Sequence, residues 1–381
     1  MEFVVIYRLN QKVGSHMAQL AWQRAVIKVG SALIAPDGKH CTGQYLLPIA
    51  RFISASRAAG KEVILVSSGS VAAGRSKISH KHHPSIAEKQ AMAAIGQTQM
   101  MANWARLFDF DCAQILLTSD DLHNRTRYVN IKNTLRELLK NNALPIVNEN
   151  DTVVINELKV GDNDNLAAYT AMVAQADTLI ICSDIDGLYD ADPRVNPGAN
   201  FIEHVSEITP QIHALASGAG SQMGTGGMRT KIQAAEKCAK CGIQTLIVNG
   251  RNSEVFANLL KGKTQGTLFT PSKSRGNARS QWLKHTLRSK GKIFIDQGAR
   301  QALISNGASL LPSGIVSVEG GFGPGEAVDI VHDGEIVAKG LVLYSAGDLI
   351  QIKGLHSDRI ETKLGYSFGE AVIHRDDLVL I

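Results

Sequence analysis

Cysteine and long apolar runs are both scarce in this sequence, and each shortage argues against a class of protein. Five of the 381 residues are cysteine, an odd number at irregular spacing, so a disulfide scaffold is not expected and a reducing cytoplasm fits better. No apolar run approaches the roughly 20 residues that cross a bilayer, so no membrane span is expected. The first residues lack the long apolar region and the cleavage site of a secretory signal.

Charge of one sign is not in large excess either. The net charge is +5, which mildly favours anionic ligands such as nucleotides or nucleic acid. Glycine, by contrast, is abundant, and many of the 35 glycines cluster in short loops between apolar runs. That arrangement indicates phosphate-binding loops or tight turns rather than disorder.

The length of the chain and a change of pattern after residue 269 predict two domains. Residues 1–20 are set aside as an N-terminal extension, because residues 14–17 read like the remnant of a cleaved tag. Residues 21–269 form the larger domain, residues 270–290 a polar, basic linker, and residues 291–381 a small domain.

The larger domain is predicted to be an α/β fold, with a mostly parallel sheet sandwiched by helices. Short apolar runs alternate with helical patterns, as expected for strands that are buried on both faces and joined by right-handed crossovers. The predicted strands are residues 25–29, 63–67, 113–117, 144–147, 179–182 and 245–248, and the predicted helices include residues 133–141, 165–176 and 230–240.

The small domain is predicted to be mainly antiparallel β structure. Its apolar runs are shorter, and Gly, Pro and Asp turns separate them. The predicted strands are residues 292–295, 314–319, 327–331, 335–343, 349–352 and 370–373.

Polar residues follow the first two predicted strands, at the edge of a parallel sheet where ligands bind. Lys28 and Gly30 end the first strand. A lysine in a buried strand indicates an anionic partner such as a phosphate, although a lysine at a strand end can also reach water. Ser68 and Gly69 end the second strand and precede a helix, whose first N–H groups form an anion site.

A set of acidic and amide side chains follows the fourth strand. Residues 148–151 read Asn-Glu-Asn-Asp, and residues 161–165 read Gly-Asp-Asn-Asp-Asn at the start of a helix. Asp162 and Asp164 are candidate Mg²⁺ ligands, or Asp164 instead holds cationic side chains. Asn163 and Asp151 suit the α-amino or carboxylate group of a small substrate. Helix capping and turn formation explain part of this set but not all of it.

Two further loops suit a nucleotide. Ser183 and Asp184 end the fifth strand in a polar loop that fits a nucleoside or an ordinary surface turn. Residues 224–231 read Gly-Thr-Gly-Gly-Met-Arg-Thr-Lys and lead into a helix, so consecutive N–H groups can form a nest for phosphate oxygens, with Lys231 facing them. A flexible hairpin explains the glycines but not the helix and the lysine.

These motifs, in this order, resemble the amino acid kinase family, and the resemblance covers about residues 24–381. Within that family, the pattern is similar throughout to that of enzymes that phosphorylate the γ-carboxylate of L-glutamate with MgATP, the first step of proline synthesis. The tail, with Leu311-Pro312 and Gly325-Glu326, resembles a PUA domain. The segments that carry the family motifs are residues 28–30, 68–74, 148–151, 161–166, 187–193 and 224–231.

The resemblance implies a role for each motif residue. Lys28 and Lys231 would contact the transferred phosphoryl group, and Asp164 would orient the two lysines. Glutamate would bind Ser68, Gly69, Asp151 and Asn163. Mg²⁺ would accompany ATP without a dedicated set of protein ligands. Feedback inhibition by proline and a homotetramer are further expectations from the family. ATP would bind Lys28, Gly30, Ser183, Asp184, Thr225, Gly226, Gly227, Met228, Arg229, Thr230 and Lys231.

Three alternatives stay open. Another kinase of the same fold would act on aspartate, acetylglutamate, carbamate or UMP. An RNA-binding protein would use the tail, since PUA domains bind structured RNA and the basic linker could contact phosphates, although the tail lacks an aromatic-rich stacking surface. A catalytically inactive regulator is disfavoured by the complete lysine pair.

Overall fold

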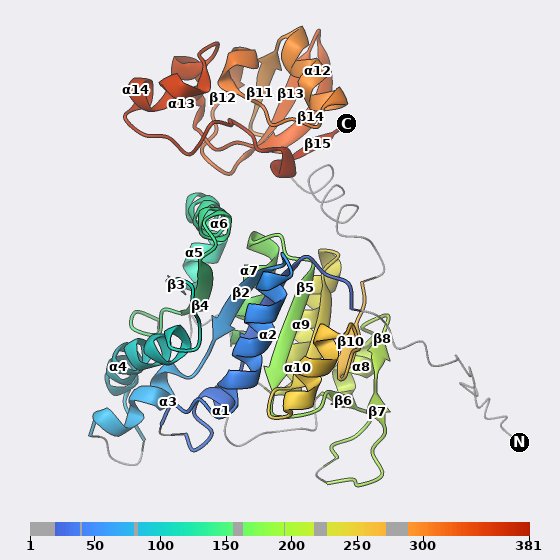
Figure 1. The fold of residues 1–381 in the computed structure, drawn as a ribbon. Coiled ribbons are helices and arrows are strands. Elements are labelled where there is room, and N and C mark those ends of the chain that lie inside the picture. Colours follow the sequence, from blue (N-terminus) through green and yellow to red (C-terminus); the bar gives the residue numbers. More distant parts are fainter. Residues whose placement is uncertain are drawn as a thin grey trace, which may run out of the picture.

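The computed structural model describes residues 20–38, 40–79, 83–154, 163–193, 195–216, 227–271 and 289–381. Two main sheets organise these residues: eight strands lie in the larger sheet and five in the smaller (Figure 1). Within the described ranges, no helix combines the length and the apolar character that crossing a membrane requires. Leu20, the last residue of the predicted N-terminal extension, packs in the core of the larger domain.

The larger sheet has the strand order β3-β4-β2-β1-β5-β9-β10-β8, and its first six strands are parallel. Each of the six contains one predicted strand, so the predicted α/β fold is confirmed. Two short strands that were not predicted extend one edge of the sheet: β10 (Thr267–Phe269) is antiparallel to β9, and it pairs in turn with β8 (His204–Val205). Two further short strands, β6 (Leu188–Tyr189) and β7 (Phe201–Ile202), form a separate pair. The six parallel strands are β1 (Arg24–Val29), β2 (Glu62–Ser67), β3 (Cys112–Leu117), β4 (Leu144–Glu149), β5 (Thr178–Ser183) and β9 (Gln244–Asn249).

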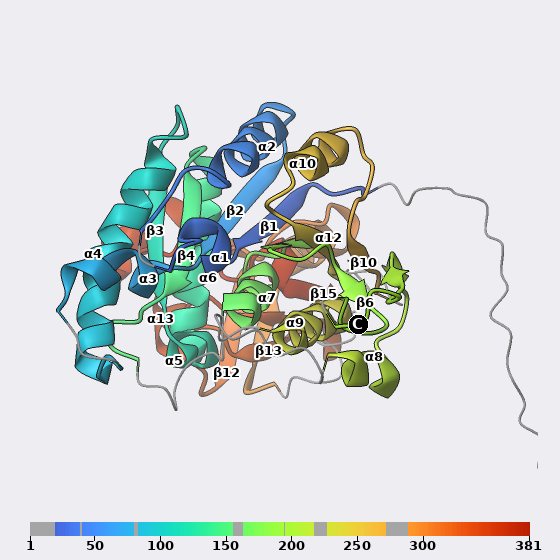
Figure 2. The same cartoon turned by 90° about the horizontal axis from the view of Figure 1, so that it is seen from below.

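Helices cover both faces of this sheet (Figure 2), because successive residues of a buried strand point to opposite sides. In β1, Ile27 packs in one hydrophobic core and Val26 in the other. The three predicted helices overlap α6, α7 and α9. The first core includes α1 (Ser31–Ile34), α2 (Leu46–Ala58), α4 (Ile86–Ala105) and α10 (Ser253–Leu260), and the second includes α6 (Arg125–Lys140), α7 (Asn163–Val173), α8 (Pro210–Leu215) and α9 (Met228–Lys240). The short helices α3 (Ser70–Gly74) and α5 (Ser119–His123) follow β2 and β3.

The strand order determines where a ligand can bind. β1 lies between β2 and β5, and Val29 near its end pairs with both Ser67 and Cys182. The loops that follow these three strands therefore meet at one edge of the sheet. In open parallel sheets, the crevice outside the carboxyl ends of the strands is the usual ligand site.

The small domain has the strand order β12-β11-β13-β14-β15, with β11 parallel to β13 and the other pairs antiparallel, which confirms a mainly antiparallel β domain. Two predicted strands are wrong. Residues 349–352 belong to a helix, because Ser345 and Asp348 form a capping box that starts it. Residues 370–373 contribute an isolated bridge from Ile373 to Leu310. The elements are β11 (Gly291–Ile295), α12 (Gln297–Ser305), β12 (Ile315–Gly320), β13 (Ala327–His332), β14 (Glu335–Leu341), α13 (Ala346–Ile352), α14 (Ile360–Leu364) and β15 (Leu378–Leu380).

Helix α6 of the larger domain contacts the small domain. Val129 packs in the hydrophobic core of the small domain, and the Lys132 ammonium forms a buried ion pair with Asp377. Arg136 lies 4.0 Å from the other carboxylate oxygen of Asp377. Most of the predicted linker, residues 272–288, lies outside the described residues. This contact therefore joins two domains whose strands form separate sheets.

Candidate active site at the carboxyl edge of the sheet

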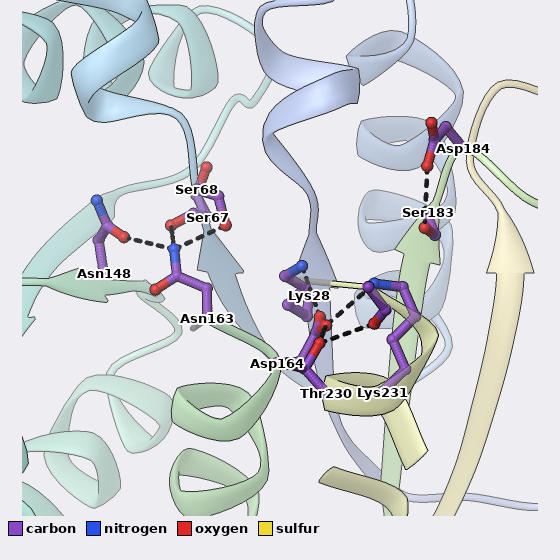
Figure 3. A network of polar contacts seen from close by, with 11 residues as sticks. Lys28, Ser67, Ser68, Asn148, Asn163, Asp164, Ser183, Asp184, Thr230 and Lys231 are labelled. Carbon is purple, nitrogen blue, oxygen red and sulfur yellow. Dashed lines mark hydrogen bonds and ion pairs between the residues drawn. The ribbon is translucent and has the colours of Figure 1, made fainter. Parts of the chain in front are cut away.

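Three charged side chains from separate elements meet at the end of β1 (Figure 3). The Lys28 ammonium lies 2.6 Å from Oδ1 of Asp164, and the Lys231 ammonium lies 3.0 Å from Oδ2 of the same carboxylate. Lys28 comes from β1, Asp164 from the first turn of α7 and Lys231 from the start of α9. They are 7%, 0% and 4% exposed, respectively. The two lysines are thus gathered around one buried carboxylate.

The environment of Asp164 keeps it ionised. Burial is the largest influence and opposes ionisation, but the attraction of Lys28 and Lys231, with their hydrogen bonds, outweighs it and holds the pKa of Asp164 well below its usual range. Thr230 Oγ1 lies 2.9 Å from Oδ2 and can donate a further hydrogen bond. Two ammonium groups against one carboxylate give this cluster a net positive charge, which suits an anionic ligand.

A second polar group lies beside this cluster, at the ends of β2 and β4 (Figure 3). Nδ2 of Asn163 donates to Oγ of Ser68 at 2.7 Å, to Oδ1 of Asn148 at 3.0 Å and to the carbonyl oxygen of Ser67 at 3.3 Å. Asn163 directly precedes Asp164, so the start of α7 positions a residue in each group.

Gly69 and Asp151 complete this side of the site. Gly69 has a φ of +95°, and a Cβ there would lie 3.0 Å from the side chain of Ile34, so the turn requires glycine. The turn leads into α3, whose first residue, Ser70, donates a hydrogen bond of 2.8 Å from Oγ to Oδ2 of Asp151. Asn150, which precedes Asp151 in the chain, lines a cavity of about 300 Å³ together with residues of α5 and with Arg127 of α6.

Of the residues predicted to bind ATP, those that the structure describes lie at the ends of β1 and β5 and at the start of α9. A Cβ on Gly30 would stand 3.7 Å from the Lys28 ammonium, so glycine leaves room beside that charge. Oγ of Ser183 donates to Oδ1 of Asp184 at 3.3 Å, on the side of the lysine pair opposite Asn163 (Figure 3).

Helix α9 adds positive potential to the same region. It begins at Met228 after Gly227, and its first turn, which includes Arg229, has no acidic residue. The free N–H groups and the dipole of a helix start favour an anion. Thr225 and Gly226 lie outside the described residues, so the predicted phosphate nest is described only from Gly227 onward.

The described residues offer no ready-made metal site. Within the described ranges, no cluster of three or more His, Cys, Asp or Glu side chains is placed to hold a metal ion. Asp162 lies outside those ranges, and Asp164 is bound by both lysines. Of the two interpretations of Asp164 drawn from the sequence, the geometry favours the one in which it holds cationic side chains.

Two contacts of the site were not anticipated from the sequence. The hydroxyl of Thr230 contacts Asp164, although Thr230 was assigned to ATP. Ser70 holds Asp151 and was not assigned any role. Thr230 is next to Lys231 in the sequence and Ser70 is next to Gly69, and this adjacency to predicted site residues is the one signal in the sequence for their contacts.

Known proteins resemble the chain over almost its whole length. Residues 23–249 match the model of the amino acid kinase family, and residues 291–364 match the PUA domain. The chain is 53% identical to "Glutamate 5-kinase" of Idiomarina loihiensis, with 95% of this chain and 98% of the relative covered. It is 52% identical to "Glutamate 5-kinase" of Salinibacter ruber, with 94% and 97% covered. It is 50% identical to "Glutamate 5-kinase" of Xanthomonas axonopodis pv. citri, with 93% and 100% covered.

Proposed function

The chain belongs to the amino acid kinase family, and from this premise we propose that it transfers the γ-phosphoryl group of ATP to the γ-carboxylate of L-glutamate. The product is L-glutamyl 5-phosphate, and the reaction is the first step of proline biosynthesis. The names of the relatives support this substrate, because these proteins are about 50% identical to the chain over nearly its full length.

The observation that carries the proposal is the pair of ammonium groups on Asp164. The side chains of Lys28 and Lys231 are nearly inaccessible, and burying two cations is costly unless anions meet them. Asp164 offsets one charge, and the remaining positive charge stands at the edge where β1, α7 and α9 converge. A phosphoryl group in transfer supplies the missing negative charge.

The reaction requires positive charge at the site rather than a general base. The γ-carboxylate of glutamate has an ordinary pKa of about 4.3, so at neutral pH it is already an anionic nucleophile. The obstacle is its repulsion from the anionic phosphate chain. Lys28, Lys231 and the start of α9 stabilise the charge that spreads over the phosphoryl oxygens in the transition state. Asp164 keeps both lysines in position.

The hydrogen bonds within the second polar group determine which of its atoms can donate to a substrate and which can accept from it. Because Nδ2 of Asn163 donates to Oγ of Ser68, the Ser68 hydroxyl can direct its own proton toward a substrate carboxylate. Oδ1 of Asn163 then remains an acceptor for the α-ammonium of glutamate. The carboxylate of Asp151, oriented by the hydrogen bond from Ser70, supplies a second hydrogen-bond acceptor, and this one is negatively charged. This arrangement suits an amino acid with a free α-ammonium group.

ATP is proposed to bind along the ends of β1 and β5 and the start of α9. Gly30 and residues 227–231 would face the phosphates, while Ser183 and Asp184 would face the nucleoside. Because Asp164 is engaged by lysines, we propose that Mg²⁺ enters with the nucleotide, held mainly by phosphate oxygens and water, as Mg²⁺ sites with few protein ligands usually are.

An ADP-release assay tests the proposal. The full chain is given MgATP with L-glutamate, L-aspartate or N-acetyl-L-glutamate at equal concentration, and the Lys231→Ala variant from a parallel preparation controls for contaminating kinases. ADP should be released with glutamate and should fall to the background level in the variant. Turnover with aspartate or acetylglutamate in place of glutamate would contradict the substrate assignment.

Three further expectations belong to the same proposal. Proline is expected to inhibit by feedback, and a proline titration in the ADP-release assay measures this. A homotetramer in the cytoplasm is expected, and sedimentation of the purified chain gives the subunit number. The PUA domain is expected to bind structured RNA, and binding that weakens as salt rises would support this role.

A further inference from the structure

One buried side chain behind the second polar group has no part in the mechanism described above. Gln97 lies in the middle of α4 and is 8% exposed. Its Oε1 accepts a hydrogen bond of 2.9 Å from Nδ2 of Asn148, which is 1% exposed. Its Nε2 is buried and has no hydrogen-bond partner among the described residues. A buried amide satisfied on one side only is unusual.

A backbone carbonyl determines the orientation of every amide in this group. The carbonyl oxygen of Ser67 can only accept, so Asn163 must turn its Nδ2 toward it. Asn148, which receives a hydrogen bond from the same Nδ2, must then present Oδ1 to Asn163 and its own Nδ2 to α4. The group on α4 that faces Asn148 must therefore be an acceptor, and Gln97 Oε1 is that acceptor.

The neighbour of Gln97 brings the helix close enough for this contact. A Cβ on Gly96 would overlap the carbonyl oxygen of Ser70, and a Cβ on Gly74 would overlap the backbone of Met92. The two glycines thus let α4 and α3 touch backbone to backbone. Gly96 holds α4 against the turn that carries Ser68 and Ser70, and Gln97 reaches from the same point to Asn148.

We propose that Gln97 is a positioning residue for the amino-acid substrate: by accepting a hydrogen bond from Asn148, it keeps Oδ1 of Asn148 against Nδ2 of Asn163, and so it holds the Asn163 amide in the orientation that the Ser67 carbonyl requires. Gln97 does not touch the substrate itself. This inference rests on the proposed function, because it names a residue that holds the hydrogen-bond donors and acceptors of the proposed glutamate site in place. Without the Oε1 acceptor, Asn148 can rotate and Asn163 loses one of its three acceptors.

Kinetics of three variants test this role. In Gln97→Met, an apolar side chain of similar length replaces the amide, and KM for glutamate should rise about tenfold, the effect of one hydrogen bond. KM for ATP should change by less than about twofold, because Lys28 and Lys231 are untouched. Gln97→Glu retains an acceptor oxygen and should restore KM for glutamate to within about threefold of the wild-type value. If the Met variant does not fold, Gln97→Asn, whose amide is one methylene short of Asn148, makes the same test.

Gln244→Leu is the matched control. Gln244 donates hydrogen bonds of 2.8 Å to the carbonyl oxygen of Ala21 and to Oγ1 of Thr178, at the opposite edge of the sheet. Its loss should lower the melting temperature without changing KM for glutamate. A wild-type KM for glutamate in Gln97→Met, equal rises in both KM values, or failure of Gln97→Glu to restore KM would each overturn the inference. Absence of glutamate turnover in the unmodified chain would instead refute the proposed function.

Discussion

Replacing Asp164 with asparagine tests how the lysine pair is held. The substitution preserves the shape of the side chain but removes the charge that lies 2.6 Å from Lys28 and 3.0 Å from Lys231. At an effective dielectric constant of about 20, each ion pair corresponds to about 6 kcal/mol of attraction. The cost of desolvating the charges offsets much of this, and breaking one buried pair typically destabilises a protein by about 3–5 kcal/mol. We expect the Asp164→Asn variant to lose stability in that range.

The same substitution should abolish most of the activity. Two unpaired ammonium groups repel each other, so neither would remain where we propose that it contacts the transferred phosphoryl group. A loss in kcat of at least about 10²-fold is expected, comparable to removing one donor from an oxyanion site. Urea unfolding measures the first effect and ADP release measures the second.

The difference in unfolding free energy between the wild type and the Asp164→Asn variant should also depend on pH. The folded-state pKa of Asp164 is lowered, so its contribution is fully present above the unfolded-state pKa of about 3.9. The contribution disappears as the pH falls below that value toward the folded-state pKa. The wild type should therefore exceed the variant by a constant margin from about pH 5 to pH 8, and the margin should shrink below about pH 4.

Asp177→Asn provides the control for Asp164→Asn. Oδ2 of Asp177 accepts hydrogen bonds of 2.8 and 3.0 Å from the backbone N–H groups of Gln23 and Arg24, at the edge of the sheet opposite the site. This variant should lose some stability and keep its kcat. Equal kcat in the Asp164 and Asp177 variants would show that Asp164 does not hold the two lysines in an active position.

Three further predictions concern the lysines, the turn after β2 and the domain contact. Lys28→Arg and Lys231→Arg should each lower kcat at least about tenfold in the ADP-release assay, because a planar guanidinium does not replace a point charge in a filled site; near-normal kcat in both would contradict this. Gly69→Ala should reduce the free energy of unfolding by about 1–3 kcal/mol, because alanine is strained at a φ of +95°, and unchanged urea denaturation would show that the turn relaxes. Asp377→Asn removes the carboxylate that pairs with buried Lys132 and should loosen the small domain, which faster proteolysis between the domains would show. Asp376→Asn, on an exposed neighbour, should leave the proteolysis rate unchanged, and equal cleavage of both variants would argue against the contact.

The strands of the larger sheet could be predicted because parallel strands buried on both faces leave continuous apolar runs. β1, β2, β4 and β5 are such strands. β8 and β10 have two and three residues and were not predicted, since so short a run has no detectable period.

In the small domain, by contrast, a strand was predicted where the structure has a helix. Leu349 and Ile352 lie in a short apolar run that resembles a strand, yet both are buried on one face of α13. Their spacing of three residues fits a helix, and Ser345 with Asp348 is a capping box. The run alone could not separate a strand from a buried helix, but the capping residues before it could have done so.

The cluster of Lys28, Asp164 and Lys231 was predictable in part, because a lysine such as Lys28 is unusual in an apolar strand. Lys231 and Asp164 follow from motifs at helix starts. Gln97 was not predictable, because a glutamine in an amphipathic helix is normally exposed and only the fold brings it to Asn148. The contact between Lys132 and Asp377 joins residues 245 positions apart, and nothing in the local sequence marks either one.

A crystal structure of the chain with MgADP, L-glutamate and aluminium fluoride, which mimics the phosphoryl group in transfer, would show whether both lysines contact that group. The ammonium groups of Lys28 and Lys231 should both lie within about 3 Å of fluoride atoms, as charge-assisted hydrogen bonds require, while Asp164 still bridges them. A fluoride complex bound elsewhere, with the two lysines facing only Asp164, would contradict the proposal that Lys28 and Lys231 act on the transferred phosphoryl group.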